Sequence, residues 1–257
     1  MNAFVLPVYS LWLRDMRHFV RRRSRIYGAI GQPVVIWALL AAGFAGSVDG
    51  SHTGGVAYGA FFFPGVLLLI TVFTSMFSTM SVIEDKKSGF MQGVLASPAS
   101  RGSLLWGKML AGSTLSLIQA AVLFALLPVA GIPVSLEAAG ASALLVAAAG
   151  LILTSLGLLI AWHMQSTQGF HAIMNLLLMP MWVLSGALFP VAGASDWLAA
   201  LIRLNPMYYV TSLFQTAFFL GSGTTVAGSP DIIMASIVAL LSGAAVYAAT
   251  LRTLSKR

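Results

Sequence analysis

Few side chains in this 257-residue chain could do chemistry, and their spacing supports no enzyme active site. The four histidines are His18, His52, His163 and His171, which do not make the close spacing of a zinc site. The chain has no cysteine, so disulfides and thiolate chemistry are excluded. No apolar stretch contains a serine-hydrolase elbow, a His-Glu-x-x-His motif or paired carboxylates. We therefore expect a protein that is not an enzyme and binds no cofactor or metal itself.

One segment half-matches the phosphate-binding pattern G-x-x-x-x-G-K-[ST]. Gly102, Gly107 and Lys108 fit, but Met109 stands where a hydroxyl must bind Mg²⁺. No strand precedes the glycines and an apolar stretch follows them. We therefore expect the start of a helix here, with Lys108 at the level of lipid headgroups.

Residues 84–101 form a short charged segment between two long apolar stretches. Glu84, Asp85, Lys86 and Lys87 open it, and it also holds apolar side chains, which are Phe90, Val94 and Leu95. A solvated hairpin that only fixes topology has no need of such apolar side chains. The segment is therefore expected to bind a soluble partner, with the charges around an apolar centre.

The composition indicates which elements must position this segment. The chain is 58% hydrophobic and only 8% charged, with a mean hydropathy of +0.91. Soluble domains carry roughly 25% charged residues, so the solvent of this chain must be lipid. Spans of about 20 residues cross the bilayer. We predict an all-α integral membrane protein that forms one domain over 1–257, with six spans at about 26–48, 61–83, 104–127, 139–162, 170–190 and 230–251.

The charges predict the orientation of these spans. Every Lys and Arg except Arg203 falls before the first span, around the second-to-third loop or at the C-terminus. The positive-inside rule then puts both termini and residues 84–101 in the cytoplasm.

Two regions outside the spans are predicted to be short helices. Residues 7–25 alternate apolar side chains with arginines at helical spacing, which is typical of an amphipathic helix at the inner membrane interface. It serves as a topology anchor or flanks a cytoplasmic partner. Residues 191–229 are expected to form two short helices, about 197–202 and 207–219, that lie on the outer face and are separated at Asn205-Pro206. Pro33 and Pro180 are expected to kink spans one and five.

The spans carry no Asp, Glu, Lys or Arg near their centres, which disfavours a self-powered ion-coupled transporter. The few amides and hydroxyls in the spans most often pair across helices, and Gln119 is one of them. The alternative is that some line a substrate path or a dimer interface. The candidate residues for that role are Gln32, Phe73, Phe77, Asn175, Met179 and Trp182.

Three motifs resemble the ABC-2 family of ATP-binding-cassette permeases. Phe62-Phe63-Pro64-Gly65 opens the second span, and Leu204-Asn205-Pro206-Met207-Tyr208-Tyr209 precedes the last. Between them, Glu84-Asp85-Lys86-Lys87-Ser88-Gly89-Phe90, Leu95-Ala96-Ser97-Pro98-Ala99-Ser100-Arg101 and Gly107-Lys108 are similar to the loop of that family. Met91-Gln92-Gly93 departs from the acidic or basic residue that many relatives carry there.

The resemblance implies a permease subunit in the cytoplasmic membrane of a bacterium. It would form a homodimer, or a heterodimer, and bind separate ATPase subunits that hold ATP and Mg²⁺. Residues 84–97 would be the coupling helix, and spans one and five the dimer interface, with close approach at Ala42, Gly46, Gly186 and Ala187. The coupling residues would be Glu84, Asp85, Lys86, Lys87, Gly89, Phe90, Val94, Leu95 and Pro98.

The substrate is not defined by these residues. The lack of buried charge favours a lipophilic or amphiphilic molecule, such as a drug, a lipid or a lipid-linked glycan, and the resemblance implies export. Two alternatives stay open: a secondary transporter or channel that needs no ATP, and a membrane scaffold subunit that moves no substrate.

Overall fold

The structure is a computed structural model, in which residues 4–21, 23–44, 55–97, 99–188, 190–224 and 226–255 are described. Over these residues the chain contains helices and no strand, so the predicted all-α fold is confirmed. The elements are α1 (Val5–Arg21), α2 (Arg23–Gly43), α3 (Tyr58–Lys87), α4 (Phe90–Ala96), α5 (Arg101–Leu126), α6 (Leu136–His163), α7 (Thr167–Ile173), η1 (Met174–Leu178), α8 (Met179–Trp182), η2 (Val183–Ala187), η3 (Val191–Gly193), α9 (Asp196–Leu204), α10 (Pro206–Phe218) and α11 (Ile232–Ser255).

Five described helical segments are long and apolar enough to cross a membrane. They are α3, α5, α6, the continuous segment Thr167–Ala187 and α11, and they correspond to the second to sixth predicted spans. The first predicted span corresponds to α2, whose apolar part, Pro33–Gly43, is shorter. Residues 45–48 of that prediction lie outside the described part of the chain. The protein is therefore a helical membrane protein.

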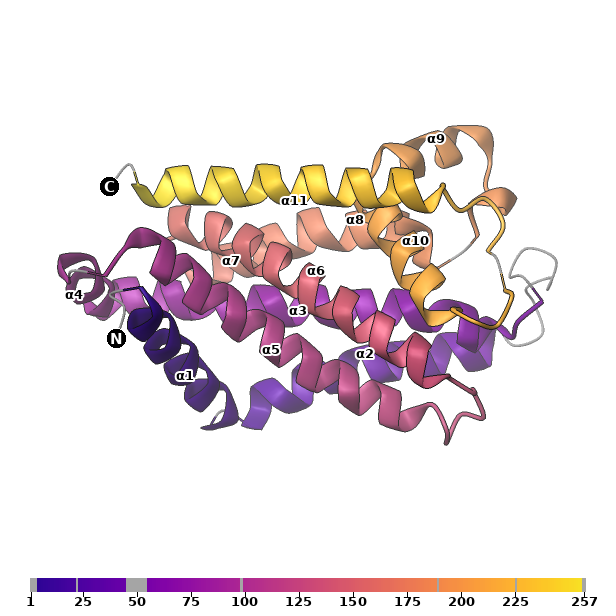
Figure 1. Cartoon of the computed structure of the whole chain (residues 1–257), viewed down its shortest axis with the longest axis horizontal. Coiled ribbons are helices and arrows are strands. Elements are labelled where there is room, and N and C mark those ends of the chain that lie inside the picture. The colour runs from indigo at the N-terminus through magenta and orange to yellow at the C-terminus, as the bar shows by residue number, and fades with distance from the viewer. Residues whose placement is uncertain are drawn as a thin grey trace.

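The helices form an elongated bundle with α3 in its middle (Figure 1). Phe61–Ile70 of α3 is buried throughout, because α2, α5, α6 and α10 pack around it. In contrast, α11 lies along one side and buries only Ala235, Gly243, Thr250 and Leu254. A helix that is apolar all round and exposed on most of its surface is suited to contact lipid. Both termini lie at the end of the bundle that carries α4, and α9 lies at the other end (Figure 1).

Polar side chains inside the spans pair between helices. Thr74 of α3 donates a hydrogen bond of 2.6 Å to the Gln119 side chain of α5. Ser155 of α6 donates to the Thr250 hydroxyl of α11 at 3.1 Å. The packing role predicted for Gln119 is therefore confirmed.

The fifth span is irregular, but not because of Pro180 alone. The π-helical turns η1 and η2 flank α8, and within η2 Leu184 leaves helical geometry and Gly186 has a φ of +75°. Asn205, between α9 and α10, donates its side-chain amide to the carbonyl oxygens of Met181 and Leu184, at 2.5 and 2.8 Å. The same side chain accepts from the Met207 amide and caps α10. Asn205 thus satisfies carbonyls that the break would leave unpaired.

Candidate functional site

The predicted partner-binding segment is divided between two helices. α3 continues through Lys87, so the Glu84–Lys87 charges lie on its last turn rather than in a loop. Gly89 follows with a φ of +77°, a conformation that a side chain disfavours, and lets the chain turn into α4. Phe90 is 41% exposed at the start of α4, whereas Met91 is buried and Val94 is partly buried. The Leu95 side chain and Pro98 lie outside the described residues.

A buried cluster of four charges supports this segment. Arg14 of α1 makes two hydrogen bonds to the Asp85 carboxylate at the end of α3. Lys108 of α5 lies 2.7 Å from an oxygen of Asp15 and 3.6 Å from an oxygen of Asp85. It also donates to the Ser81 hydroxyl at 2.9 Å. The two acids and two bases balance, so the cluster joins α1, α3 and α5 without net charge.

Three members of the cluster are withdrawn from solvent, whereas the Arg14 side chain is 25% exposed. Lys108 is 1% exposed, Asp85 4% and Asp15 7%. Burial of single charges at this level is very costly, and only mutual pairing makes it tolerable. The hydrogen bonds to Asp85 raise the pKa of Arg14 above its ordinary value, despite the opposing effect of burial. The Arg14 guanidinium carbon also lies 3.9 Å from the centre of the Phe90 ring, so the cluster contacts α4.

Close packing of α1 on α5 makes this cluster possible. A Cβ atom added at Gly107 would lie 2.9 Å from Cβ of Leu11 and 3.1 Å from the Val8 carbonyl oxygen. Trp12 of α1 donates to the Thr114 hydroxyl of α5 at 3.1 Å. The Gly107-Lys108 pair therefore has a structural role: the glycine admits α1 and the lysine pairs with its carboxylate. Lys108 does not reach out to the surface, because its charge is compensated by Asp15 and Asp85 inside the protein.

The other charges of the segment differ in exposure. Lys86 donates to the carbonyl oxygens of Trp162 and Met164, at 2.6 and 3.0 Å, and so caps the C-terminal end of α6. Lys87 is exposed and Glu84 is partly buried. Asp85 does not lie on a polar rim, because its pairing with Arg14 and Lys108 buries it. The surface of the segment is therefore formed by Phe90 and Lys87 more than by the acids.

The residues predicted to line a path or dimer interface do not form one site. Phe73 and Phe77 are partly buried with ring centres 5.8 Å apart. Met179 is partly buried and Asn175 is exposed. Trp182, however, is 3% exposed and donates to the Gly65 carbonyl oxygen at 2.9 Å, so it belongs to the protomer core. The Gln32 side chain lies outside the described residues.

The small residues expected at the dimer interface do not share one environment. Gly186 and Ala187 are buried inside the protomer, where a Cβ added at Gly65 would lie 2.5 Å from Cβ of Ala187. Ala187 thus approaches α3, and a Cβ added at Gly186 would lie 3.3 Å from Val191 and 3.5 Å from Tyr208, so both contacts are within the protomer, which corrects the expectation of contact with a second copy. Ala42 is exposed, and Gly46 lies outside the described residues.

The buried acids of the site are engaged in ion pairs rather than grouped around a metal position, among the residues that the structure describes. No group of three or more His, Asp or Glu there could hold a metal ion. The acids of the cluster are already neutralised by Arg14 and Lys108. What the arrangement can do is hold α4 on a rigid, charge-balanced base and present Phe90 to a partner.

Comparison with known proteins identifies the family. The family model described as "ABC-2 type transporter" matches residues 7–219. The chain is 26% identical to "Putative transport permease ycf38" of Cyanophora paradoxa, over 84% of this chain and 81% of that one. It is 27% identical to "Probable multidrug ABC transporter permease YbhR" of Escherichia coli, over 74% of this chain, and spans about half, 52%, of that protein's length. The chain belongs to the ABC-2 type transporter family and is a membrane-embedded transport permease.

Proposed function

We propose that this permease dimerises, binds separate ATPase subunits through α4, and uses their ATP hydrolysis to export a lipophilic or amphiphilic substrate. The observation that carries the proposal is Phe90, an exposed aromatic side chain on a short helix whose base is a buried ion cluster. Solvent-exposed helices of this size have little stability of their own. An aromatic anchor beside charged groups is the chemistry with which a helix enters an apolar groove on a partner.

The cluster gives a route from the partner to the spans. A force on α4 acts on Phe90, and through it on Arg14, which pairs with Asp85. Asp85 and Lys108 belong to α3 and α5, and Asp15 to α1, so these helices move together when α4 moves. ATP binding to the partner then selects one of two arrangements of the bundle.

The orientation and substrate class follow from the same proposal. With α4 facing the ATPase subunits, both chain ends lie in the cytoplasm, as the distribution of Lys and Arg predicts. The membrane is the cytoplasmic membrane of a bacterium, and ATP and Mg²⁺ are held by the partner. The word "multidrug" in the name of one relative supports a lipophilic cargo.

A pair of matched variants tests the partner site. Phe90→Ala with Leu95→Ala removes two apolar side chains proposed to contact the partner, and Val129→Ala truncates an apolar side chain that is 86% exposed in the connection between α5 and α6. That connection lies at the end of the bundle away from α4 (Figure 1). Loss of an interface anchor costs about 2 kcal/mol, or about thirtyfold in affinity. The α4 variant should therefore lose co-purification of the ATPase subunit and ATP-driven export, and Val129→Ala should keep both. Unchanged association and export in both variants would contradict the assignment of α4.

Reconstitution separates the alternatives. Substrate flux through vesicles that contain this chain alone would favour a secondary transporter or channel. ATPase binding with no substrate movement in the complete complex would favour a scaffold subunit. ATP-dependent flux that needs both subunits supports the exporter.

A further inference from the structure

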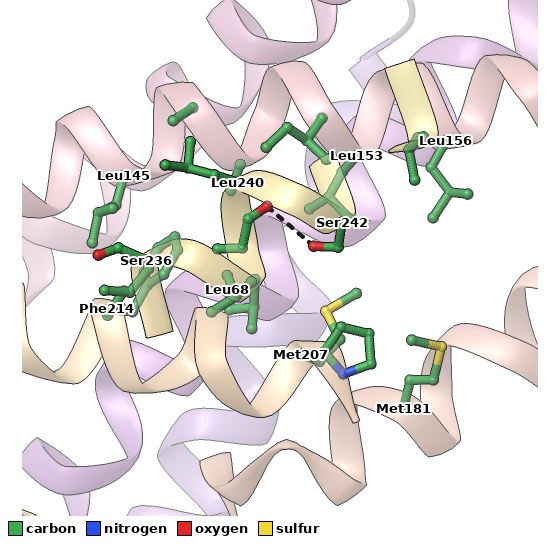
Figure 2. A pocket seen from close by; sticks show the side chains of 18 residues that line it. Leu68, Leu145, Leu153, Leu156, Met181, Met207, Phe214, Ser236, Leu240 and Ser242 are labelled. Atoms are coloured by element: carbon green, nitrogen blue, oxygen red, sulfur yellow. Dashed lines mark hydrogen bonds between the residues drawn. The ribbon is translucent and has the colours of Figure 1, made fainter. Parts of the chain in front are cut away.

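A cavity of about 330 Å³ lies inside the bundle, on the side where α11 packs (Figure 2). Figure 2 shows side chains from α3, α6, α8, α10 and α11 around it, among them Leu68, Leu153, Met181, Met207 and Leu240. The volume falls in the range of about 300–1,000 Å³ that is usual for ligand sites. None of the described residues predicted for the substrate path lines it, so the sequence did not indicate this cavity.

The lining is almost entirely hydrocarbon. Among the described residues that line it, only Ser236 and Ser242 have polar side chains, and Ser242 donates its hydroxyl to the Ala239 carbonyl oxygen of its own helix at 3.1 Å (Figure 2). A water needs about 2–4 polar partners to stay in a buried site, which this cavity does not provide. A drug with polar groups would leave those groups unpaired. The lining therefore accepts a purely apolar occupant.

Helix α11, which forms one wall, is held against its neighbours by contacts at two separate positions. These contacts keep α11 from moving inward and filling the cavity. Towards the α4 end of the bundle, a Cβ added at Gly243 would lie 2.6 Å from the Ile152 side chain, and Thr250 is hydrogen-bonded to Ser155. Towards the α9 end, Ala235 is fully buried in a second apolar cluster that includes Ile202 and Tyr208. Around these contacts, Ser236, Ala239, Leu240, Ser242 and Val246 of α11 line the cavity opposite side chains of α6 and α10.

The mouth of the cavity lies on a face that contacts lipid. Leu240, which lines the cavity, is 69% exposed, and its neighbours Ile237 and Leu241 are 51% and 67% exposed. α11 is one of the candidate membrane spans, and only 11% of its most apolar window is buried. In the bilayer, the molecules that reach such a mouth are lipid hydrocarbon chains.

We propose that this cavity binds one acyl chain of a membrane phospholipid, inserted between α11 and α10, with the headgroup left outside. Met181 and Met207 are unbranched and adaptable, which suits a flexible chain better than a rigid ring. Contacts with the walls, rather than a hydrophobic force, hold the chain, because lipid tails are as apolar as the cavity. The chain fills a void that otherwise leaves the lining side chains without partner atoms.

A photoreactive lipid tests the proposal. The wild-type permease is placed in vesicles of phosphatidylethanolamine and phosphatidylglycerol, doped with phosphatidylethanolamine that carries a diazirine in one acyl chain. After irradiation, labelled residues are mapped by peptide mass spectrometry. We expect labels on Met207 and Phe214, which line the cavity, as well as on Leu144, which is 73% exposed on α6.

Two phenylalanine substitutions on α11 supply the matched comparison. Ala239→Phe fills the cavity, whereas Ala248→Phe adds the same ring on an exposed position that does not line it. Labelling of Met207 and Phe214 should fall to background in Ala239→Phe and persist in Ala248→Phe. Leu144 should be labelled in all three proteins, which verifies that each one is inserted in the bilayer. Wild-type protein without label at Met207 and Phe214, or equal labelling there in both variants, would overturn the proposal.

Discussion

Removal of the Lys108 charge is the sharpest perturbation of the cluster. Lys108→Met keeps a long apolar stem but deletes an ammonium group that is 1% exposed and 2.7 Å from Asp15. Asp85 keeps Arg14, whereas Asp15 loses the cation that neutralises it. Breaking a buried ion pair from one side costs about 3–5 kcal/mol, because an uncompensated charge stays behind.

This loss should be visible as a shift of thermal unfolding. For proteins of about 150–250 residues, each kcal/mol shifts Tm by about 2–4 °C, so Lys108→Met should lower Tm by roughly 6–20 °C. The assay is intrinsic tryptophan fluorescence of the purified permease in lipid nanodiscs, which uses the six native tryptophans.

Two further variants separate charge compensation from side-chain loss. Lys87→Met deletes an exposed lysine at the same end of the bundle and should stay within about 0.5 kcal/mol of wild type. Lys108→Met with Asp15→Asn restores neutrality and should recover much of the loss, since residues in contact couple by about 0.5–3 kcal/mol. If Lys108→Met unfolds at the same temperature as Lys87→Met, or if the double variant is no more stable than the single one, the cluster does not act as described.

Three other substitutions test separate contacts. Gly107→Leu should push α1 off α5, cost about 1–3 kcal/mol and speed tryptic cleavage after Arg17, because its Cβ would meet Leu11 at 2.9 Å; normal protection of α1 would disprove this. Asn205→Ala leaves two carbonyls without donors and should lower stability by about 1–3 kcal/mol in the same fluorescence assay. An unchanged stability would mean that water replaces the amide and would contradict this role of Asn205. Trp182→Phe removes the hydrogen bond to Gly65, so it should lower Tm yet leave transport per folded molecule unchanged. A changed substrate preference would instead show that Trp182 lines the substrate path.

Hydropathy and charge were enough to predict most of the fold. Apolar runs of span length correspond to α3, α5, α6, Thr167–Ala187 and α11, because lipid demands such runs wherever a helix crosses it. The short helices α9 and α10 were predicted from the break at Asn205-Pro206 and from apolar spacing. The end of α3 was placed too early, because the charges of Glu84–Lys87 suggested a loop. In the fold, Asp85 and Lys86 are partnered, and the helix continues.

The cluster itself could not be predicted from one sequence. Asp15 and Lys108 are 93 positions apart, and Arg14 and Asp85 are 71 apart. Helical periodicity shows which residues share a face, but it does not show which distant helix that face contacts. The half-matched phosphate-binding pattern was the available signal. Met109 breaks the nucleotide-binding pattern, so the small Gly107 beside the cation Lys108 needed another explanation. Close packing of α1 at Gly107 and the buried pair of Lys108 with Asp15 provide it.

Trp182 and Gly186 illustrate a second limit. A large aromatic or a small residue inside a span has the same sequence signature whether it lines a path, packs against a second copy or fills the protomer core. The role of such a residue depends on which residue lies next to it in the fold. Here Gly65 of α3 accepts the Trp182 hydrogen bond, and Tyr208 packs near Gly186. Phe73, Phe77 and Asn175 keep part of their surface outside the core.

The two proposed sites place different demands on the bundle. The α4 end is braced by opposite charges that join α1, α3 and α5, so a displacement of α4 is transmitted rather than absorbed. In contrast, α11 buries only Ala235, Gly243, Thr250 and Leu254, and the cavity lies between it and helices α6 and α10. Bundle movement driven from α4 would therefore reach α11 through α5 and α6, and a lipid chain in the cavity would resist or accommodate it. If so, the same Ala239→Phe variant that excludes the chain should change the rate of ATP-driven export, whereas Ala248→Phe should not.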